Sequence, residues 1–257
     1  MPATDWGWMI TPEELRGWIL EETPEFLVLN KPPHVVCHRS RNGEWSSLIG
    51  ACREYLGAEV LRMPCRLDRE TSGVMVFGRT KEAGTRLQRA VQFQCYRKTY
   101  YAVLTGEMEA AITCRGAIGP DVGAEFYSRQ TVVAEGGDAA ETEFAPVAWG
   151  GGFTLARVHP QTGRRHQIRV HAEAVGYPLV GDKLYGADSS IMLRFMRDRM
   201  TAEMLETLLL DRQALHCSQV EFETAEFGPG GGREVFSAPP PADLAAFVLA
   251  KTGYVWE

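Results

Sequence analysis

Clusters of apolar residues separated by turn residues predict short strands along much of the chain. The apolar run at residues 26–29 is ended by Asn30, a lysine and two prolines, which a central strand does not tolerate. A second buried strand is expected at residues 74–77. Residues 130–134 and 141–149 are expected to pair as a hairpin across Gly136-Gly137-Asp138. Further strands are expected at residues 98–104, 153–158, 215–222 and 234–236.

Helical spacing of apolar residues, together with capping residues, predicts helices between these strands. Thr11 precedes a proline and has Glu14 three residues on, which predicts a helix to about residue 20. Thr80 is expected to cap a helix whose buried face holds Ala83, Leu87, Ala90 and Val91. The other expected helices cover residues 46–56 (closed by Gly57), a segment from Thr162-Gly163 to Gly176, residues 190–210, and a last one starting at Pro241.

Strands outnumber helices in this pattern, and several of them adjoin as hairpins. The pattern therefore predicts an α+β fold with a mixed, largely antiparallel central sheet and flanking helices. The sequence contains no internal repeat, no low-complexity segment and no linker long enough to divide the chain. We expect residues 1–20 to form a short N-terminal extension with a helix and residues 21–257 to form one domain.

The composition is that of a soluble globular protein. Apolar residues make up 45% and charged residues 23% of the chain, and no apolar run is long enough to cross a membrane. The N-terminus carries Asp5, Glu13 and Glu14 without a basic start, unlike a secretory signal. The six cysteines are scattered with no CxxC pair. We therefore expect reduced thiols in a cytoplasmic protein rather than a disulfide framework or a zinc site.

The net charge of −6 argues against a general nucleic-acid binder, but the charges are unevenly spread. Two stretches contain no acidic residue, at residues 83–106 and 144–172. Their basic residues are Arg86, Arg89, Arg97 and Lys98, then Arg157, Arg164, Arg165 and Arg169. Such stretches are usually solvated faces, yet the two could form one basic rim facing a polyanion.

One carboxylate stands out before the strand at residues 74–77. Asp68 lies between Arg66 and Arg69 and is followed by Thr71-Ser72-Gly73. Neighbouring guanidinium groups keep a carboxylate ionised, which suits a nucleophile or a stabiliser of positive charge. The alternative is an ordinary ion-paired surface turn, which is common in proteins.

Two later segments carry further polar residues. In the strand at residues 98–104, Tyr100 and Tyr101 point to opposite faces, so one of them at most lines a given site. The segment at residues 162–171 contains His166 and His171, five residues apart, whereas two zinc ligands on one helical face need four. Its arginines could also be phosphate contacts in an unrelated RNA binder.

These segments resemble the motifs of the RluA-like pseudouridine synthases. Residues 65–73, CRLDRETSG, resemble the family's HRLDxxTSG motif, with Cys65 in place of histidine. Residues 97–106 resemble KxYxAxVxG, and residues 162–171 and 176–186 resemble TGRxHQIRxH and GxPxxGDxxYG. Residues 26–38 resemble the NKPxGxxxH stretch, with His34 where glycine is usual, and residues 212–216 resemble RQxLHA. We expect no S4-type RNA-binding domain, which some members carry, before a catalytic domain at residues 21–257.

The resemblance implies an active-site cleft and a set of residue roles. Asp68 would be the catalytic nucleophile, or the base that starts glycal formation, and Arg169 would pair with it. Tyr100 would stack on the uracil and help to remove the C5 proton. The residues implied in substrate binding are Arg66, which would fill the space left by the flipped base, with Thr71, Arg164, Arg165, His166 and Gln167. The family implies ribosomal or transfer RNA as partner and neither metal nor organic cofactor; a monomer is expected.

Two other functions compete with this interpretation. A phosphohydrolase with an aspartate nucleophile needs a second aspartate two residues later to bind magnesium, but that position is Glu70. A catalytically inactive RNA-binding module of the same fold is the second alternative. The joint presence of Asp68, Tyr100 and Arg169 favours the enzyme.

Overall fold

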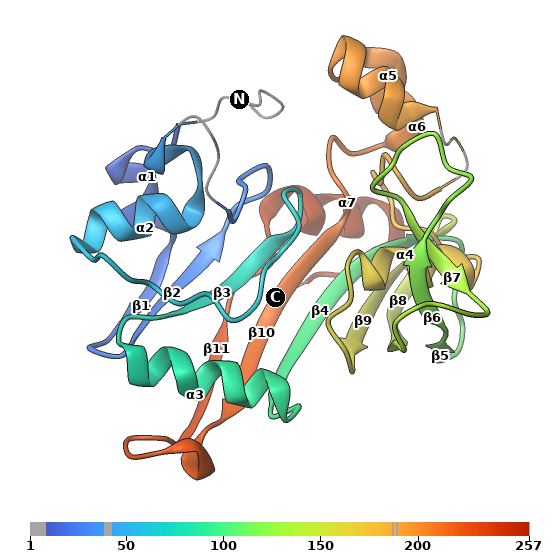
Figure 1. The fold of residues 1–257 in the computed structure, drawn as a ribbon. Helices are drawn as coiled ribbons and strands as arrows, with labels where there is room; N and C mark the ends of the chain where they lie inside the picture. Colours follow the sequence, from blue (N-terminus) through green and yellow to red (C-terminus); the bar gives the residue numbers. More distant parts are fainter. Residues whose placement is uncertain (1–8, 39–42, 187, 189, 257) are drawn as a thin grey trace. The chain divides into compact units, whose positions relative to one another are not determined.

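The computed structural model describes residues 9–38, 43–186, 188 and 190–256. The chain divides into two compact units, each built from separate parts of the sequence. The first contains residues 1–98 and 217–239, and the second contains residues 99–216 and 240–257. The boundary passes through two strands, β4 (Tyr96–Thr105) and β10 (Leu215–Glu223), which continue from one unit into the other (Figure 1).

The first unit is built on strands paired in the order β1 (Ile19–Glu22), β2 (Phe26–Lys31), β3 (Ser72–Gly78) and β10, with β11 (Arg233–Ser237) pairing β10. β2 and β3 are antiparallel, and every residue of β3 is buried. The helices are α1 (Pro12–Trp18), α2 (Leu48–Leu56) and α3 (Lys81–Gln92), with 3-10 turns at Glu44–Ser46 and Ala225–Phe227. In this unit α1 packs on α2 and β2, and α3 packs on β3 (Figure 1).

The helix ends of this unit follow the local sequence. Thr11 and Glu14 form the expected capping box at the start of α1. The Thr80 hydroxyl accepts a hydrogen bond from the Ala83 amide at the start of α3. α2 begins after Ser47 and ends at Gly57, which adopts the left-handed conformation with φ of 59°. These local predictions are confirmed.

The second unit pairs strands in the order β4, β9 (Phe153–Pro160), β8 (Glu141–Gly150) and β5 (Ile112–Arg115), all antiparallel. A separate two-stranded sheet joins β6 (Ala117–Pro120) to β7 (Gln130–Val133). Helices α4 (Gln167–Ala174) and α7 (Ala242–Thr252) pack on this unit's strands. α5 (Ile191–Asp198) and α6 (Ala202–Leu208) share a small apolar cluster.

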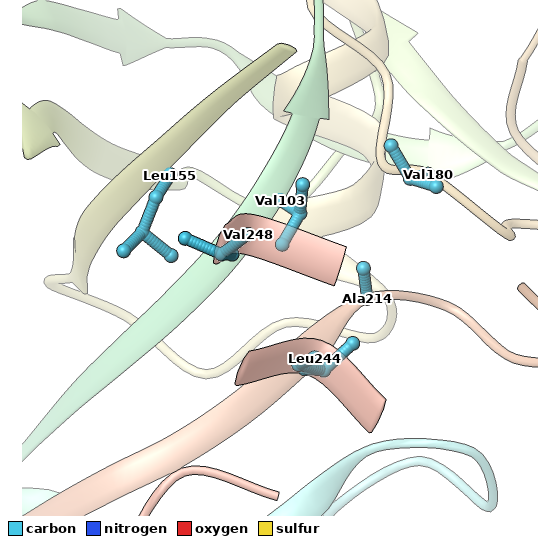
Figure 2. Packing of buried hydrophobic residues seen from close by; sticks show 6 residues of the cluster. All are labelled: Val103, Leu155, Val180, Ala214, Leu244 and Val248. Atoms are coloured by element: carbon cyan, nitrogen blue, oxygen red, sulfur yellow. The ribbon is translucent and has the colours of Figure 1, made fainter. Parts of the chain in front are cut away.

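The core of the second unit is formed by residues distant in sequence. Figure 2 shows six buried side chains of one cluster: Val103, Leu155, Val180, Ala214, Leu244 and Val248. Each is at most 3% exposed. The chain around residue 180 joins β4 through backbone hydrogen bonds between Val103 and Val180, and the chain at Ala214 bonds to both. This packing fixes the position of the segment after Val180, which carries Asp182 and Tyr185 of the candidate site.

Four local predictions are wrong. Val91 is 37% exposed, and the buried face of α3 includes Arg86 instead, paired with Glu25. β7 does not pair with β8 as a hairpin, because β7 pairs with β6 and β8 with β9 and β5. The helix expected at residues 190–210 is two helices, broken at Arg199, whose φ is 64°, and α6 is capped anew by Thr201. α4 begins at Gln167, later than expected, because His166 is left-handed.

The α+β class with a largely antiparallel central sheet and flanking helices is confirmed. Residues 1–8 of the expected N-terminal extension lie outside the described residues, and the division into an extension and one catalytic domain stays a prediction. None of the helices in the described part of the chain is long and apolar enough to span a membrane.

Candidate active site

The Asp68 loop of the first unit leads directly into β3. Leu67 and Thr71 are buried and Asp68 is half-buried. The Thr71 amide donates a hydrogen bond of 3.2 Å to the Asp68 carbonyl, which closes a turn. The carboxylate thus stands on a turn that a fully buried strand fixes at one end.

A buried ammonium group supports the same loop. The Nζ of Lys31, whose side chain is fully buried, donates to the carbonyls of Pro32 and Arg69 at 2.9 and 3.0 Å. Arg69 Nε in turn donates to the His34 carbonyl at 3.1 Å. Lys31 therefore ties the end of β2 to the residue after Asp68, and it brings a positive charge to the loop. Burial raises the pKa of the nearby Cys37 thiol, and the Lys31 charge lowers it.

The conformation of His34 explains why the family uses glycine at this position. His34 is 6% exposed and has a φ of 68°, in the left-handed region that glycine adopts without strain. Histidine is among the side chains that tolerate this region best after glycine. The departure from the family pattern therefore leaves the loop geometry in place.

In the second unit, the Gln167 amide orders the turn that starts α4. Its Nε2 donates to the Glu141 carbonyl and the Thr142 hydroxyl at 2.9 and 3.0 Å. Its Oε1 accepts from the Thr162 hydroxyl at 2.7 Å and from the Arg164 amide at 3.0 Å. Both protons and both lone pairs of the side chain are used, so Gln167 holds the turn. A contact from Gln167 to substrate stays a prediction.

Arg169 forms a buried bidentate ion pair with Asp182. Nε and Nη2 of Arg169 lie 2.6 and 2.8 Å from the two carboxylate oxygens, and the Asp182 side chain has no exposed surface. Asp182 also accepts the backbone amides of Leu184 and Tyr185. Burial alone would raise the pKa of Asp182, but Arg169 and the two amides hold that pKa below its usual value. The implied pairing of Arg169 with Asp68 stays a prediction.

Tyr185 connects this ion pair to the His166 turn. Its hydroxyl lies 2.8 Å from Nδ1 of His166 and accepts the Gln130 amide at 3.0 Å. The guanidinium groups of Arg169 and Arg129 lie 4.8 and 5.1 Å from its ring centroid. Arg129 is held by Asp121 and by both oxygens of Glu173. Tyr185 and the two arginines on its ring are therefore each held in place by neighbouring polar or charged groups.

Tyr100 lies on β4, opposite Val158 of β9, and is 5% exposed. Its neighbour Tyr101 packs against Trp256, with ring centroids 5.0 Å apart, at the core cluster of Figure 2. Strand alternation places the two tyrosines on opposite faces. Tyr101 is thus occupied by the core, which is consistent with choosing Tyr100 as the site residue.

Two of the eight basic residues of the predicted rim are buried. Arg86 is 4% exposed and bound to Glu25 and the Pro229 carbonyl, and Arg169 is 7% exposed. Because both guanidinium groups are buried and bound to carboxylates, the prediction that Arg86 and Arg169 belong to the basic rim is wrong. Lys98 is half-buried, and the exposed members are Arg89, Arg97, Arg157, Arg164 and Arg165. Arg66, expected at the flipped base, is also exposed.

No group of three or more potential metal ligands occurs among the described residues.

The sequence model described as RNA pseudouridylate synthase matches residues 25–174, a segment that contains Asp68, Tyr100 and Arg169. The chain belongs to the RNA pseudouridylate synthase family. The resemblance to the RluA-like members and the enzymatic class are thereby confirmed: this pseudouridine synthase converts uridine in RNA to pseudouridine.

Curated relatives cover most of this pseudouridine synthase. It is 31% identical over 92% of its length to the ribosomal large subunit pseudouridine synthase D of Pseudomonas aeruginosa, covering 72% of that protein. It is 34% identical over 90% of its length to the protein of the same name from Vibrio cholerae, covering 70% of it. The human RNA pseudouridylate synthase domain containing 1 has the same fold, with a TM-score of 0.68, 24% identity and coverage of 93% and 89% of the two chains.

Some residues that shape the site of this synthase were not predicted. Asp182 and Tyr185 lie in a segment already matched to the family, but that match alone gave them no role. Lys31 could have been found as a lysine at the end of an apolar strand, where a charged group needs partners. Arg129 could not be identified from the sequence, since it lies in no motif and its partner Glu173 is distant in sequence.

Proposed function

We propose that this synthase modifies uridine in large-subunit ribosomal RNA and that Asp68 is its catalytic carboxylate. The names of its curated relatives support the RNA class. The structure of the loop supports the assignment of Asp68. Its half-buried carboxylate stands on a turn that is anchored by Lys31 and by β3. Such anchoring positions a reactive group before substrate arrives.

The reaction breaks the N1–C1′ bond, turns the uracil and forms a C5–C1′ bond. Asp68 either attacks C1′ and displaces the uracil, or removes the 2′ proton and starts glycal formation. In both routes the C5 proton must leave after the new bond forms, and Tyr100 is the group proposed to assist. Water must stay out of the site, because it would hydrolyse the cleaved ribose.

The first experiment supplies the purified protein with large-subunit ribosomal RNA and, separately, with transfer RNA, and maps pseudouridine in each. Modification confined to the ribosomal RNA is expected. Modification of transfer RNA alone would overturn the substrate class, and the absence of pseudouridine in both RNAs, with binding retained, would favour the inactive RNA-binding module.

Replacing Tyr100 by Phe keeps the buried ring and removes the hydroxyl. If this hydroxyl moves a proton, the single-turnover rate should fall by roughly 10²–10⁴, the usual contribution of general acid–base catalysis. RNA affinity should stay unchanged because the stacking ring remains. Tyr101→Phe on the opposite strand face is the control and should keep the wild-type rate. An unaltered rate for Tyr100→Phe would leave Tyr100 as a stacking surface alone.

The exposed arginines give a prediction on salt dependence. Each phosphate neutralised adds about 0.7–0.9 to the slope of log affinity against log salt concentration. Arg165→Gln and Arg89→Gln should each reduce that slope by about one contact and leave the rate at saturating RNA intact. Arg197 is exposed, paired with Asp198 and outside the basic stretches, so Arg197→Gln is the matched control. An RNA affinity that does not change with salt concentration would contradict the prediction that these arginines bind phosphates.

A further inference from the structure

The buried side chain of His171 joins α4 to two neighbouring segments of the second unit. Its Nε2 lies 3.1 Å from the carbonyl oxygen of Gly116, the residue between β5 and β6. Its Nδ1 lies 2.9 Å from the hydroxyl oxygen of Thr142 on β8. Neither His171 nor Thr142 has exposed surface. The sequence resemblance placed His171 in a family motif but gave it no role.

The partner of Nε2 determines which ring nitrogen carries the proton. A carbonyl oxygen only accepts hydrogen bonds, so Nε2 of His171 donates to Gly116. Burial lowers the pKa of His171, because the charged imidazolium would lose its hydration, so the ring is neutral at neutral pH. A neutral imidazole with its proton on Nε2 keeps a lone pair on Nδ1. The Thr142 hydroxyl therefore donates its proton to Nδ1.

Gln167, at the other end of this series of hydrogen bonds, gives the same direction independently. Its Nε2 donates to the Glu141 carbonyl at 2.9 Å, and its Oε1 accepts the Arg164 amide at 3.0 Å. Because a carbonyl only accepts and a backbone amide only donates, these two partners fix the orientation of the Gln167 side chain. The second proton on Nε2 points to the Thr142 hydroxyl oxygen at 3.0 Å, which leaves the proton of that hydroxyl for His171.

We propose that His171 is a positioning residue, held as the neutral tautomer with its proton on Nε2, and that it orders the turn that starts α4 through Thr142 and Gln167. This turn carries the exposed side chains of Arg164 and Arg165. A turn that is ordered before RNA arrives loses less conformational entropy on binding. The part of the turn in RNA binding rests on the proposed function, whereas its ordering by His171 rests on the contacts of the second unit alone.

Thr142→Val interrupts the series at its middle with a side chain of nearly the same shape, and Thr142→Ser retains the hydroxyl. Without RNA, the Arg164 amide should exchange its hydrogen about tenfold faster in Thr142→Val, the effect of one hydrogen bond, and at the wild-type rate in Thr142→Ser. Thr154 is also fully buried on a strand of this unit, and its hydroxyl both accepts and donates. Thr154→Val is therefore the matched control and should leave exchange at Arg164 unchanged.

Nitrogen-15 NMR on the full chain, with histidine signals assigned through the backbone, reports the ring itself. Wild-type His171 should carry its proton on Nε2 at neutral pH. Thr142→Val should keep that tautomer, since Gly116 still accepts from Nε2, and should shift the Nδ1 resonance. A wild-type proton on Nδ1 overturns the proposal, even if Thr142→Val fails to fold. Equal exchange of the Arg164 amide in folded Thr142→Val and Thr154→Val overturns it as well.

RNA kinetics separate positioning from a general loss of stability. Thr142→Val should raise the KM for RNA by about tenfold, with kcat within about twofold of the wild type, and Thr142→Ser should restore the wild-type values. Thr154→Val should change neither constant. Loss of kcat at an unchanged KM contradicts the proposal, and so does an equal rise of KM in Thr154→Val. An inactive wild type with the expected tautomer and exchange rates would refute the proposed function and leave the ordering of the turn by His171 standing.

Discussion

Asp68→Asn is expected to reduce isomerisation by roughly 10⁴-fold or more, in the range observed when a central catalytic group is removed. The amide has the shape of the carboxylate but can neither attack C1′ nor remove a proton. RNA affinity should stay within a few-fold of the wild type, because the turn between Leu67 and β3 is made by backbone groups and remains intact. Single-turnover formation of pseudouridine, measured at saturating RNA, is the test.

Glu70 offers a matched control for this variant, since it is a half-buried carboxylate two residues along the same turn. Glu70→Gln should retain activity. Substantial turnover by purified Asp68→Asn would refute the assignment of the catalytic residue, and it would leave the family membership untouched.

Arg169→Met should destabilise the fold by about 3–5 kcal/mol, because it leaves the buried Asp182 carboxylate without its partner. In the wild type the pKa of Asp182 is lowered, so its contribution to stability is present above the ordinary value of about 3.9 and is lost as pH falls through the lower folded pKa. In the variant, burial raises the pKa of Asp182, so stability should instead decline as pH rises above about 4. Urea unfolding at several pH values measures both curves.

The double variant Arg169→Met with Asp182→Asn provides the control, because it removes the unpaired charge and should abolish the added pH dependence. The proposed pairing with Asp68 predicts an effect of opposite sign on catalysis. Without a neighbouring guanidinium the pKa of Asp68 would rise, so residual activity should recover as pH increases. A normal rate with a flat pH profile would show that Arg169 does not support Asp68.

The sequence predicted best where the determinants are local. Gly57 ends α2 and Thr80 caps α3 as expected, because a cap depends on a few neighbouring residues. Val91 was misplaced because periodicity shows which residues share a face but not which of them meets a partner. Arg86 can be buried there because Glu25 and the Pro229 carbonyl, both distant in sequence, bind it. The pairing of β7 with β6 is likewise a choice between strands that local pattern does not make.

The candidate site shows the same division. The motifs identified Asp68, Tyr100 and Arg169 as candidates, because reactive residue types in a fixed order can be recognised from the sequence alone. The residues that hold the candidate site in place could not be predicted, because each of them acts through a contact between segments that are separate in the sequence. Lys31 is defined by its approach to the Arg69 carbonyl, and Tyr185 is defined by its approach to His166.

The division of the chain also bears on its synthesis by the ribosome. β3 is an entirely buried strand with β2 on one side and β10 on the other, but β10 begins at Leu215. At Gly73 the backbones come so close that an added Cβ would lie 2.1 Å from the Cys217 carbonyl oxygen. While the middle of the chain is being translated, the nascent first unit therefore carries an apolar strand with one open edge, the type of surface that promotes aggregation. β10 covers this edge and β11 then pairs with β10, so we expect the first unit to complete its folding only after residues 99–216 of the second have been translated.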